Sequence, residues 1–132
     1  MDSFIHREED YALRIVIYLA TVGKMVKTKE ICDKLYLTRP IVLKITNKLK
    51  CCGFLTTKTG KDGGLTVADF VYDASMYDIL KCMGFNSRMN KCLNHTENCQ
   101  LMPICKVNDL FYNIQNDIEL QLKNAKIKEF LY

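Results

Sequence analysis

Two short amphipathic segments separated by a tight turn constrain the fold of this chain most. In residues 29–35 and again in residues 39–50, apolar side chains recur at the three- and four-residue spacing of one helix face. Thr38 is a good N-cap for the second segment, and Pro40 falls in its first turn, where a missing backbone N–H costs nothing. Two short helices joined in this way are typical of a helix-turn-helix. The sequence therefore predicts this motif, with the second helix as its recognition helix.

A glycine-rich stretch follows the second helix. Gly53 ends that helix, and residues 54–58 and 65–68 are short runs of β-prone side chains around a tip at residues 59–64. Two such runs around a glycine-rich tip predict a β-hairpin. A hairpin directly after a recognition helix is a wing. Its glycines would let the backbone turn tightly and approach a phosphate.

Two further helices are predicted on either side of this unit. Residues 11–22 are almost entirely apolar, which indicates a largely buried first helix with Asp10 at or near its N-cap. Residues 76–83 lie between Ser75, a suitable N-cap, and Gly84, a suitable stop. We therefore expect a short helix there.

The last part of the chain carries the pattern of one long helix. Apolar residues recur from Val107 to Ala125 in alternating steps of three and four. A stripe this wide needs to be covered, either by the body of the chain or by a partner, and we favour a homodimer. The predicted fold class is mainly α with a small β-hairpin. It comprises a winged helix-turn-helix DNA-binding domain at residues 1–84 and a cysteine loop with a dimerisation helix at residues 85–132.

Basic side chains gather in the middle of the chain. The net charge is only +4, but residues 39–61 contain an arginine, several lysines and no acidic side chain. Beside a winged-helix pattern, such a basic face predicts binding to double-stranded DNA rather than an ordinary solvated surface. Side chains at the start of the recognition helix would lie nearest to base edges, and those of the wing nearest to phosphates. The predicted DNA-contacting residues are Thr38, Arg39, Pro40, Lys44, Lys48, Lys58 and Lys61.

The cysteine content and the N-terminal residues indicate a reducing compartment. The chain has seven cysteines, which is an odd number, and its first residues are rich in acidic side chains and lack the features of a secretory signal. The longest apolar run, residues 11–20, is about half of the roughly 20 residues that a membrane span needs. We therefore expect a cytoplasmic protein with no membrane partner.

Three of the cysteines, Cys92, Cys99 and Cys105, stand in a polar stretch with neither a helical nor a strand period. A buried free cysteine normally has apolar neighbours, so these three thiols are predicted to be metal ligands. Soft thiolates suit an iron–sulfur cluster. Zinc held by the three cysteines and His95, or a metal-free thiol sensor, stays open as an alternative. The other cysteines fall in helical apolar patterns and are expected in the core: Cys32, Cys51, Cys52 and Cys82.

The order of these parts resembles the Rrf2 family of bacterial transcription regulators. The resemblance spans nearly the whole chain and rests on order and spacing rather than on one motif. The residues that carry it are Asp10-Tyr11-Ala12-Leu13-Arg14, Tyr18-Leu19-Ala20, the helix-turn-helix from Ile31 to Leu49, Gly53-Phe54-Leu55, Gly63-Gly64, Tyr77-Asp78-Ile79-Leu80 and the three loop cysteines.

This resemblance implies a homodimeric winged-helix protein in which Cys92, Cys99 and Cys105 ligate a 4Fe–4S or 2Fe–2S cluster. It also implies that Asp10 is a fourth ligand, given to the cluster of the other subunit, and His95 is a rival for that role. Nitric oxide, oxygen or iron scarcity would remove or modify the cluster and so change how the dimer binds DNA. An aerobic preparation can lack the cluster.

An enzymatic function is not expected. The chain has no Cys-x-x-Cys pair, no nucleotide-binding loop, and no acid–base constellation around His6 and His95, its only histidines. We therefore predict a regulator with no small-molecule substrate. A helical interaction module that does not bind DNA is a further alternative, and salt-dependent duplex binding separates the two.

Overall fold

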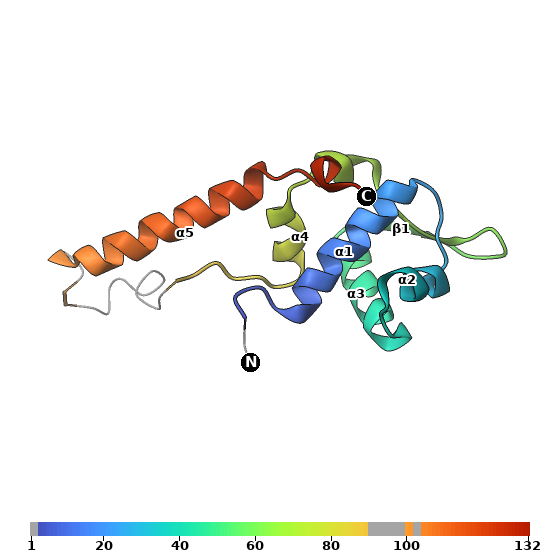
Figure 1. Cartoon of the computed structure of the whole chain (residues 1–132), viewed down its shortest axis with the longest axis horizontal. Helices are drawn as coiled ribbons and strands as arrows, with labels where there is room; N and C mark the ends of the chain where they lie inside the picture. Colours follow the sequence, from blue (N-terminus) through green and yellow to red (C-terminus); the bar gives the residue numbers. More distant parts are fainter. Residues whose placement is uncertain (1–2, 90–99, 102–103) are drawn as a thin grey trace.

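A computed structural model describes residues 3–89, 100–101 and 104–132 of the chain, arranged as Figure 1 shows. Helices dominate, so the predicted fold class, mainly α with a small hairpin, is confirmed. Within the described ranges, no helix has the length and hydropathy needed to cross a membrane. The elements in chain order are α1 (Arg7–Val22), α2 (Thr28–Leu35), α3 (Arg39–Cys51), β1 (Leu55–Lys58), β2 (Gly64–Val67), η1 (Asp69–Asp73), α4 (Met76–Cys82), α5 (Lys106–Asn124) and η5 (Ile127–Phe130).

Helix α1 begins earlier than the apolar pattern indicates, because polar residues form its first turn. Its N-cap is His6, whose backbone N–H donates to the Glu9 carboxylate at 2.7 Å. Glu8, Glu9 and Asp10 fill the first turn, where acidic side chains complement the positive end of the helix dipole. Asp10 therefore lies inside the first turn and is not the N-cap.

Helices α2 and α3 form the helix-turn-helix. Tyr36 ends α2 with a left-handed backbone of φ 56°, and Thr38 is the N-cap of α3, with Pro40 in the first turn. The apolar faces of the two helices meet α1 in the core, where Ile31 and Ile45 are fully buried. Their other faces remain accessible to solvent.

The hairpin packs against the helical body through an extended residue between α1 and α2. Strands β1 and β2 pair in antiparallel register from Leu55 opposite Val67. Val26 then exchanges two backbone hydrogen bonds of 2.8 Å with Leu65 on β2. This bridge, which the sequence pattern did not predict, holds the base of the wing against the body.

Helix α4 begins at the predicted cap. The Ser75 hydroxyl oxygen accepts a hydrogen bond from the Asp78 backbone N–H, and the Asp78 carboxylate accepts one from the Ser75 N–H, each at 3.1 Å. This reciprocal arrangement satisfies two donors at the helix start. The helix ends at Cys82, one residue before the predicted end, and packs against both α1 and α5.

Helix α5 is attached to the body at its C-terminal end. Beyond it, Ile127 is fully buried and its N–H donates to the Ala74 carbonyl at 2.9 Å, while the Met76 N–H donates to the Ala125 carbonyl at 2.8 Å. The short helices η1 and η5 meet at this junction and were not predicted. From there α5 extends away from the body, and its N-terminal end is outermost (Figure 1).

Candidate functional site

Helix α3 has two chemically different faces. Val42, Ile45 and Leu49 are fully buried in the core. Thr46 shares that face and donates its hydroxyl hydrogen to the Val42 carbonyl at 2.8 Å, so this buried polar group is satisfied within the helix. The predicted DNA-contacting residues at the start and on the other side of the helix are all exposed: Thr38, Arg39, Pro40, Lys44 and Lys48.

One of these lysines is paired with an acid of α1. Lys44 Nζ lies 2.8 Å from Glu8 Oε1, and this hydrogen bond lowers the pKa of the Glu8 carboxyl from its usual value of 4.5. The two side chains are 58% and 42% exposed, so the pair is worth only about 0–1 kcal/mol and can open. Arg39 and Lys48 form no ion pair within the part of the chain that the structure describes. Neither side chain is therefore held in an ion pair there, although the charge of Lys48 contributes to lowering the pKa of Glu8.

The wing carries the other two predicted contacts. Lys58 is the last residue of β1, Lys61 lies in the turn, and both are exposed. Lys27, which the sequence analysis did not single out, donates from Nζ to the Gly60 carbonyl at 3.0 Å. It adds a third cation beside the wing tip.

The wing glycines have a structural explanation. A Cβ on Gly63 would collide with the Lys58 carbonyl, and a Cβ on Gly64 would lie 2.5 Å from the Val26 carbonyl oxygen. Gly64 also has a φ of 150°, which disfavours other residues. The glycines therefore let the hairpin turn tightly, as predicted, and pack against Val26. Their approach to a phosphate stays a prediction.

Cys105 is the predicted ligand thiol that falls within the described residues. It is the half-buried N-cap of α5, and its Sγ accepts a hydrogen bond from the Asn108 N–H at 3.4 Å. The positive end of the helix dipole favours negative charge at this position, which suits a thiolate ligand. The predicted ligands Cys92 and Cys99, and the rival ligand His95, lie outside the described residues.

Asp10, the predicted fourth ligand, lies on a different part of the protomer. Its Oδ2 accepts a hydrogen bond from Arg14 Nε at 2.8 Å, which raises the pKa of the Arg14 guanidinium. Figure 1 shows the start of α5, where Cys105 lies, well separated from the start of α1. Across the described ranges, no three His, Cys, Asp or Glu side chains assemble into a metal-binding group. Within one protomer, Asp10 and Cys105 are therefore not brought together.

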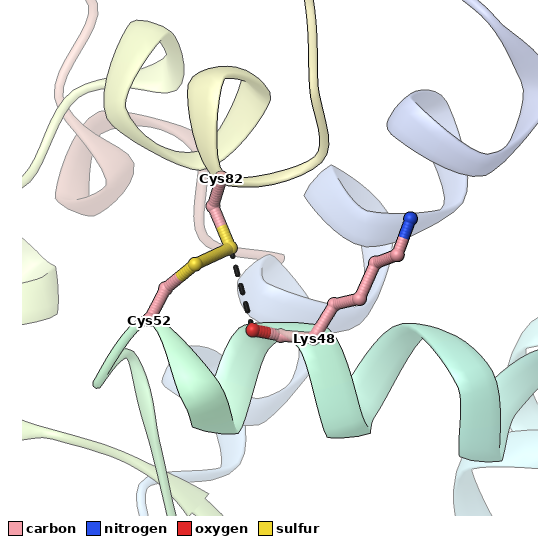
Figure 2. The surroundings of a disulfide bond; sticks show 3 residues. All are labelled: Lys48, Cys52 and Cys82. Carbon is pink, nitrogen blue, oxygen red and sulfur yellow. Dashed lines mark hydrogen bonds between the residues drawn. A yellow bond between two sulfur atoms is a disulfide. The ribbon is translucent and has the colours of Figure 1, made fainter.

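Two cysteines that were expected in the core are bonded to each other. Cys52 and Cys82 form a disulfide, with Cα atoms 6.2 Å apart (Figure 2). Cys51 and Cys52 are exposed because they follow Leu49, the last buried residue of α3, so the core prediction is wrong for both. Cys32 and Cys82 are half-buried and pack against the core.

The apolar stripe of α5 is only partly covered. Leu122 and Ala125, near the C-terminal end, pack against the core, whereas Val107 and Leu110 are 57% and 55% exposed. No side chain of α5 is fully buried against the described part of the protomer. An uncovered stripe of this width is typical of a helix that packs on a partner.

Comparisons with known proteins agree with this arrangement. The Rrf2 family model, described as an iron-dependent transcriptional regulator, matches residues 5–132. The HTH-type transcriptional regulator NsrR of Halalkalibacterium halodurans is 25% identical over 125 residues, which cover 92% of this chain and 86% of that protein.

Solved structures show the same fold. CymR (YrzC), the global cysteine regulator of B. subtilis, is similar with a TM-score of 0.81 and 18% identity, over 98% of this chain and 95% of its own. T. potens IscR has a TM-score of 0.73 and 17% identity, over 93% of this chain and 82% of its own. The predicted winged helix-turn-helix followed by a long helix is confirmed.

Proposed function

Because the chain belongs to the Rrf2 family of transcriptional regulators, we propose that it binds double-stranded DNA as a homodimer and that an iron–sulfur cluster gates this binding. The chain is a transcriptional regulator and not an enzyme, because the family and the relative that it matches are transcriptional regulators. Residues 1–84 would bind DNA, and residues 85–132 would provide the cluster ligands other than Asp10 and the dimer contacts. The protein would act on DNA in the cytoplasm, without a membrane partner or a small-molecule substrate.

The exposed basic face of α3 is the observation that carries the DNA-binding proposal. Arg39 stands at the start of the helix, the end that reaches base edges when a recognition helix enters the major groove. Lys48 lies further along the exposed side, and Lys58 and Lys61 lie on the wing. Each of these cations that neutralises a phosphate releases a counterion, so DNA affinity should fall steeply with salt.

Salt-dependent binding to a random-sequence duplex tests the proposal. Lys48→Ala should weaken binding and reduce the slope of log affinity against log salt by about 1, since one phosphate contact is lost. The matched control is Lys123→Ala, which removes a lysine of α5 that lies over the Tyr77 ring at 4.8 Å. It should leave both quantities unchanged. DNA binding by this face would be contradicted if the wild-type affinity did not change with salt concentration. It would also be contradicted if both variants had the same affinity and the same salt slope.

The stripe of α5, which the described part of the protomer covers only partly, supports the homodimer. It runs from Val107 through Leu110 toward Leu122, and only its C-terminal end reaches the core. A second copy of the same stripe is an apolar surface of matching length, and symmetric pairing of identical surfaces is the commonest form of association. The two recognition helices would then be held at a fixed spacing.

The chemistry of the donor set supports a cluster on Cys92, Cys99 and Cys105. Thiolates are the usual ligands of iron–sulfur clusters, and when bound, the cluster would supply a centre sensitive to nitric oxide, redox state or iron supply. Cys105 would hold it at the start of α5. The same helix carries the apolar stripe, so a change in ligation would act directly on the element that pairs the protomers.

Asp10 is proposed as the fourth ligand, contributed by the other protomer. Its separation from Cys105 within one chain supports a contribution across the dimer (Figure 1). A carboxylate oxygen is a weaker ligand than a thiolate and leaves its iron easier to displace. Asp10→Ala should shorten the lifetime of the cluster or alter its reaction with nitric oxide while the dimer persists. If His95→Ala has that effect and Asp10→Ala does not, the fourth ligand is His95.

A zinc-binding or metal-free thiol-responsive regulator of the same fold is the alternative. The observation that favours a metal-free device is the disulfide between Cys52 and Cys82, which pairs thiols outside the proposed ligand set. The iron, sulfide and zinc contents of anaerobically prepared protein separate the three possibilities. Equal amounts of iron and sulfide indicate a cluster, zinc without sulfide indicates a zinc site, and neither metal indicates a thiol device.

A further inference from the structure

The disulfide joins the recognition helix to the helix that supports α5. Cys52 is the C-cap of α3, and Cys82 is the last residue of α4. Their Cα separation of 6.2 Å is one that disulfides commonly span, and 30 residues separate them in sequence. Helix α4 in turn contacts α5. The bond therefore links the proposed DNA-reading helix covalently to α4, which packs against the proposed dimer element.

The end of α3 keeps its hydrogen bonds in both the disulfide and the reduced state of this pair. Figure 2 shows the Cys82 sulfur beside the Lys48 carbonyl oxygen, 3.5 Å away. A disulfide sulfur has no proton to donate, but a reduced Cys82 thiol could donate a weak hydrogen bond to that carbonyl. The Cys52 backbone N–H already donates to the same oxygen at 3.1 Å. Opening the bond therefore leaves the backbone of the last turn of α3 satisfied.

The pair is partly accessible to solvent. Cys52 is exposed, whereas Cys82 is half-buried. Reactive thiols are at least partly exposed, as this pair is. Disulfides in a reducing cytoplasm are usually transient or redox-sensing, so an accessible cross-link here suits a switch better than a permanent support.

We propose that Cys52 and Cys82 are a reversible redox site, oxidised by low-molecular-weight disulfides of the glutathione class. The exposed Cys52 thiolate attacks one sulfur of the small disulfide, forms a mixed disulfide and releases one small thiolate. The Cys82 thiolate then attacks the Cys52 sulfur, forms the protein disulfide and releases the second small thiolate. The two cysteines lose two electrons and two protons, and the small disulfide becomes two thiols. Excess small thiol reverses both steps.

Oxidation of this site restrains the end of the recognition helix. Gly53 and Phe54 follow Cys52 directly and lead into β1, so the cross-link also restrains the base of the wing against α4. In this way the redox state sets how firmly the basic face is oriented relative to α5. The restrained form is pre-organised and binds duplex DNA more tightly. The tighter DNA binding rests on the proposed function, whereas the redox site itself does not. The redox site uses cysteines other than the three proposed cluster ligands.

Equilibration of the full-length protein in glutathione buffers, from fully reducing to fully oxidising, tests the redox site. Differential alkylation with mass spectrometry should show Cys52 and Cys82 becoming protected together and reversibly. Hydrogen exchange should slow by at least about tenfold at the amides of Cys52, Gly53 and Phe54, which all donate to carbonyls of α3. Cys51→Ser is the matched control and should behave as wild type, because Cys51 is exposed at the same helix end but unbonded.

Cys52→Ser in the same buffers should show neither change, which isolates this pair from the effects of oxidants on the other cysteines. Failure of the cross-link to form at any buffer ratio, or its formation without slower exchange, would overturn the proposal. Binding to a random-sequence duplex should be at least about fivefold tighter for the oxidised protein than for the reduced one. Equal or weaker binding by the oxidised form would overturn the regulatory role. If neither form binds DNA, the proposed function fails while the redox site stands on alkylation and exchange.

Discussion

The winged-helix body and helix α5 are packed in opposite ways. In the body, α1, α3 and α4 each place a fully buried isoleucine in a common core: Ile15, Ile45 and Ile79 are 0% exposed. Helix α5 also carries an apolar stripe, yet it buries no side chain within the described part of the protomer. The described contacts of the chain therefore complete the core of the body, whereas they leave the stripe of α5 only partly covered, as the proposed dimer requires.

Shortening a core residue of α3 should have the largest effect on the stability of the body. Leu49→Ala removes a fully buried side chain and should lower the free energy of unfolding by about 3 kcal/mol, measured by urea denaturation at fixed protein concentration. The control is Leu43→Ala on the same helix, where the leucine is 38% exposed and the loss should stay below about 1 kcal/mol. Equal losses would contradict the two-faced packing of α3.

A charge placed on the stripe of α5 should weaken the dimer and leave the stability of the body unchanged. Ile114→Lys should raise the dissociation constant of the dimer by about 10- to 100-fold, or about 1.4–2.8 kcal/mol, in sedimentation experiments. The helix content should be unchanged, because Ile114 is only half-buried in the protomer.

The control for this variant is Leu120→Lys. Leu120 is 58% exposed and lies about 240° further around the helix than Ile114, on a different side. Its replacement should leave the dimer intact. A dimer that survives Ile114→Lys, or that Leu120→Lys disrupts equally, would show that this stripe is not the seam.

A smaller effect on DNA affinity is expected from the ion pair between Glu8 and Lys44, which ties one lysine of the basic face to α1. Glu8→Gln frees Lys44 and should strengthen duplex binding by about two- to threefold, since the half-exposed pair is worth at most about 1 kcal/mol. The hydrogen bond from Lys44 lowers the pKa of Glu8, so the pair forms fully above the ordinary carboxyl pKa. It is lost only as the pH falls through the lowered value. The affinity ratio of variant to wild type should therefore be the same at about pH 6 and about pH 8. A ratio that changes over this range would implicate a different group.

The parts of the body that sequence reasoning could predict are those with local signals. The N-cap positions Thr38 and Ser75 and the glycine-rich tip at residues 59–64 act within a few residues of their own position, so the helix starts and the hairpin followed from them. The stripe of α5 could also be predicted, because the spacing of its apolar residues does not depend on what the helix packs against.

The features that were missed depend on residues far apart in the chain. The Glu8–Lys44 pair spans 36 residues and the Cys52–Cys82 bond spans 30, and nothing near either residue indicates its partner. Cys51 and Cys52 fit a helical apolar pattern but lie beyond the point where α3 leaves the core. Such contacts follow from how the helices pack, which the local pattern does not specify.

The proposed iron–sulfur cluster on Cys92, Cys99 and Cys105 is tested most directly by the metal content of anaerobically purified protein. Wild type should contain iron and acid-labile sulfide in equal amounts, about two or about four atoms of each per chain, with visible absorbance. Cys105→Ala should lose both, whereas Cys51→Ala, which removes an exposed cysteine outside the proposed set, should keep them. Wild-type protein without iron and sulfide would contradict the proposed cluster. A Cys105→Ala variant with the full wild-type iron and sulfide content and visible spectrum would contradict it equally.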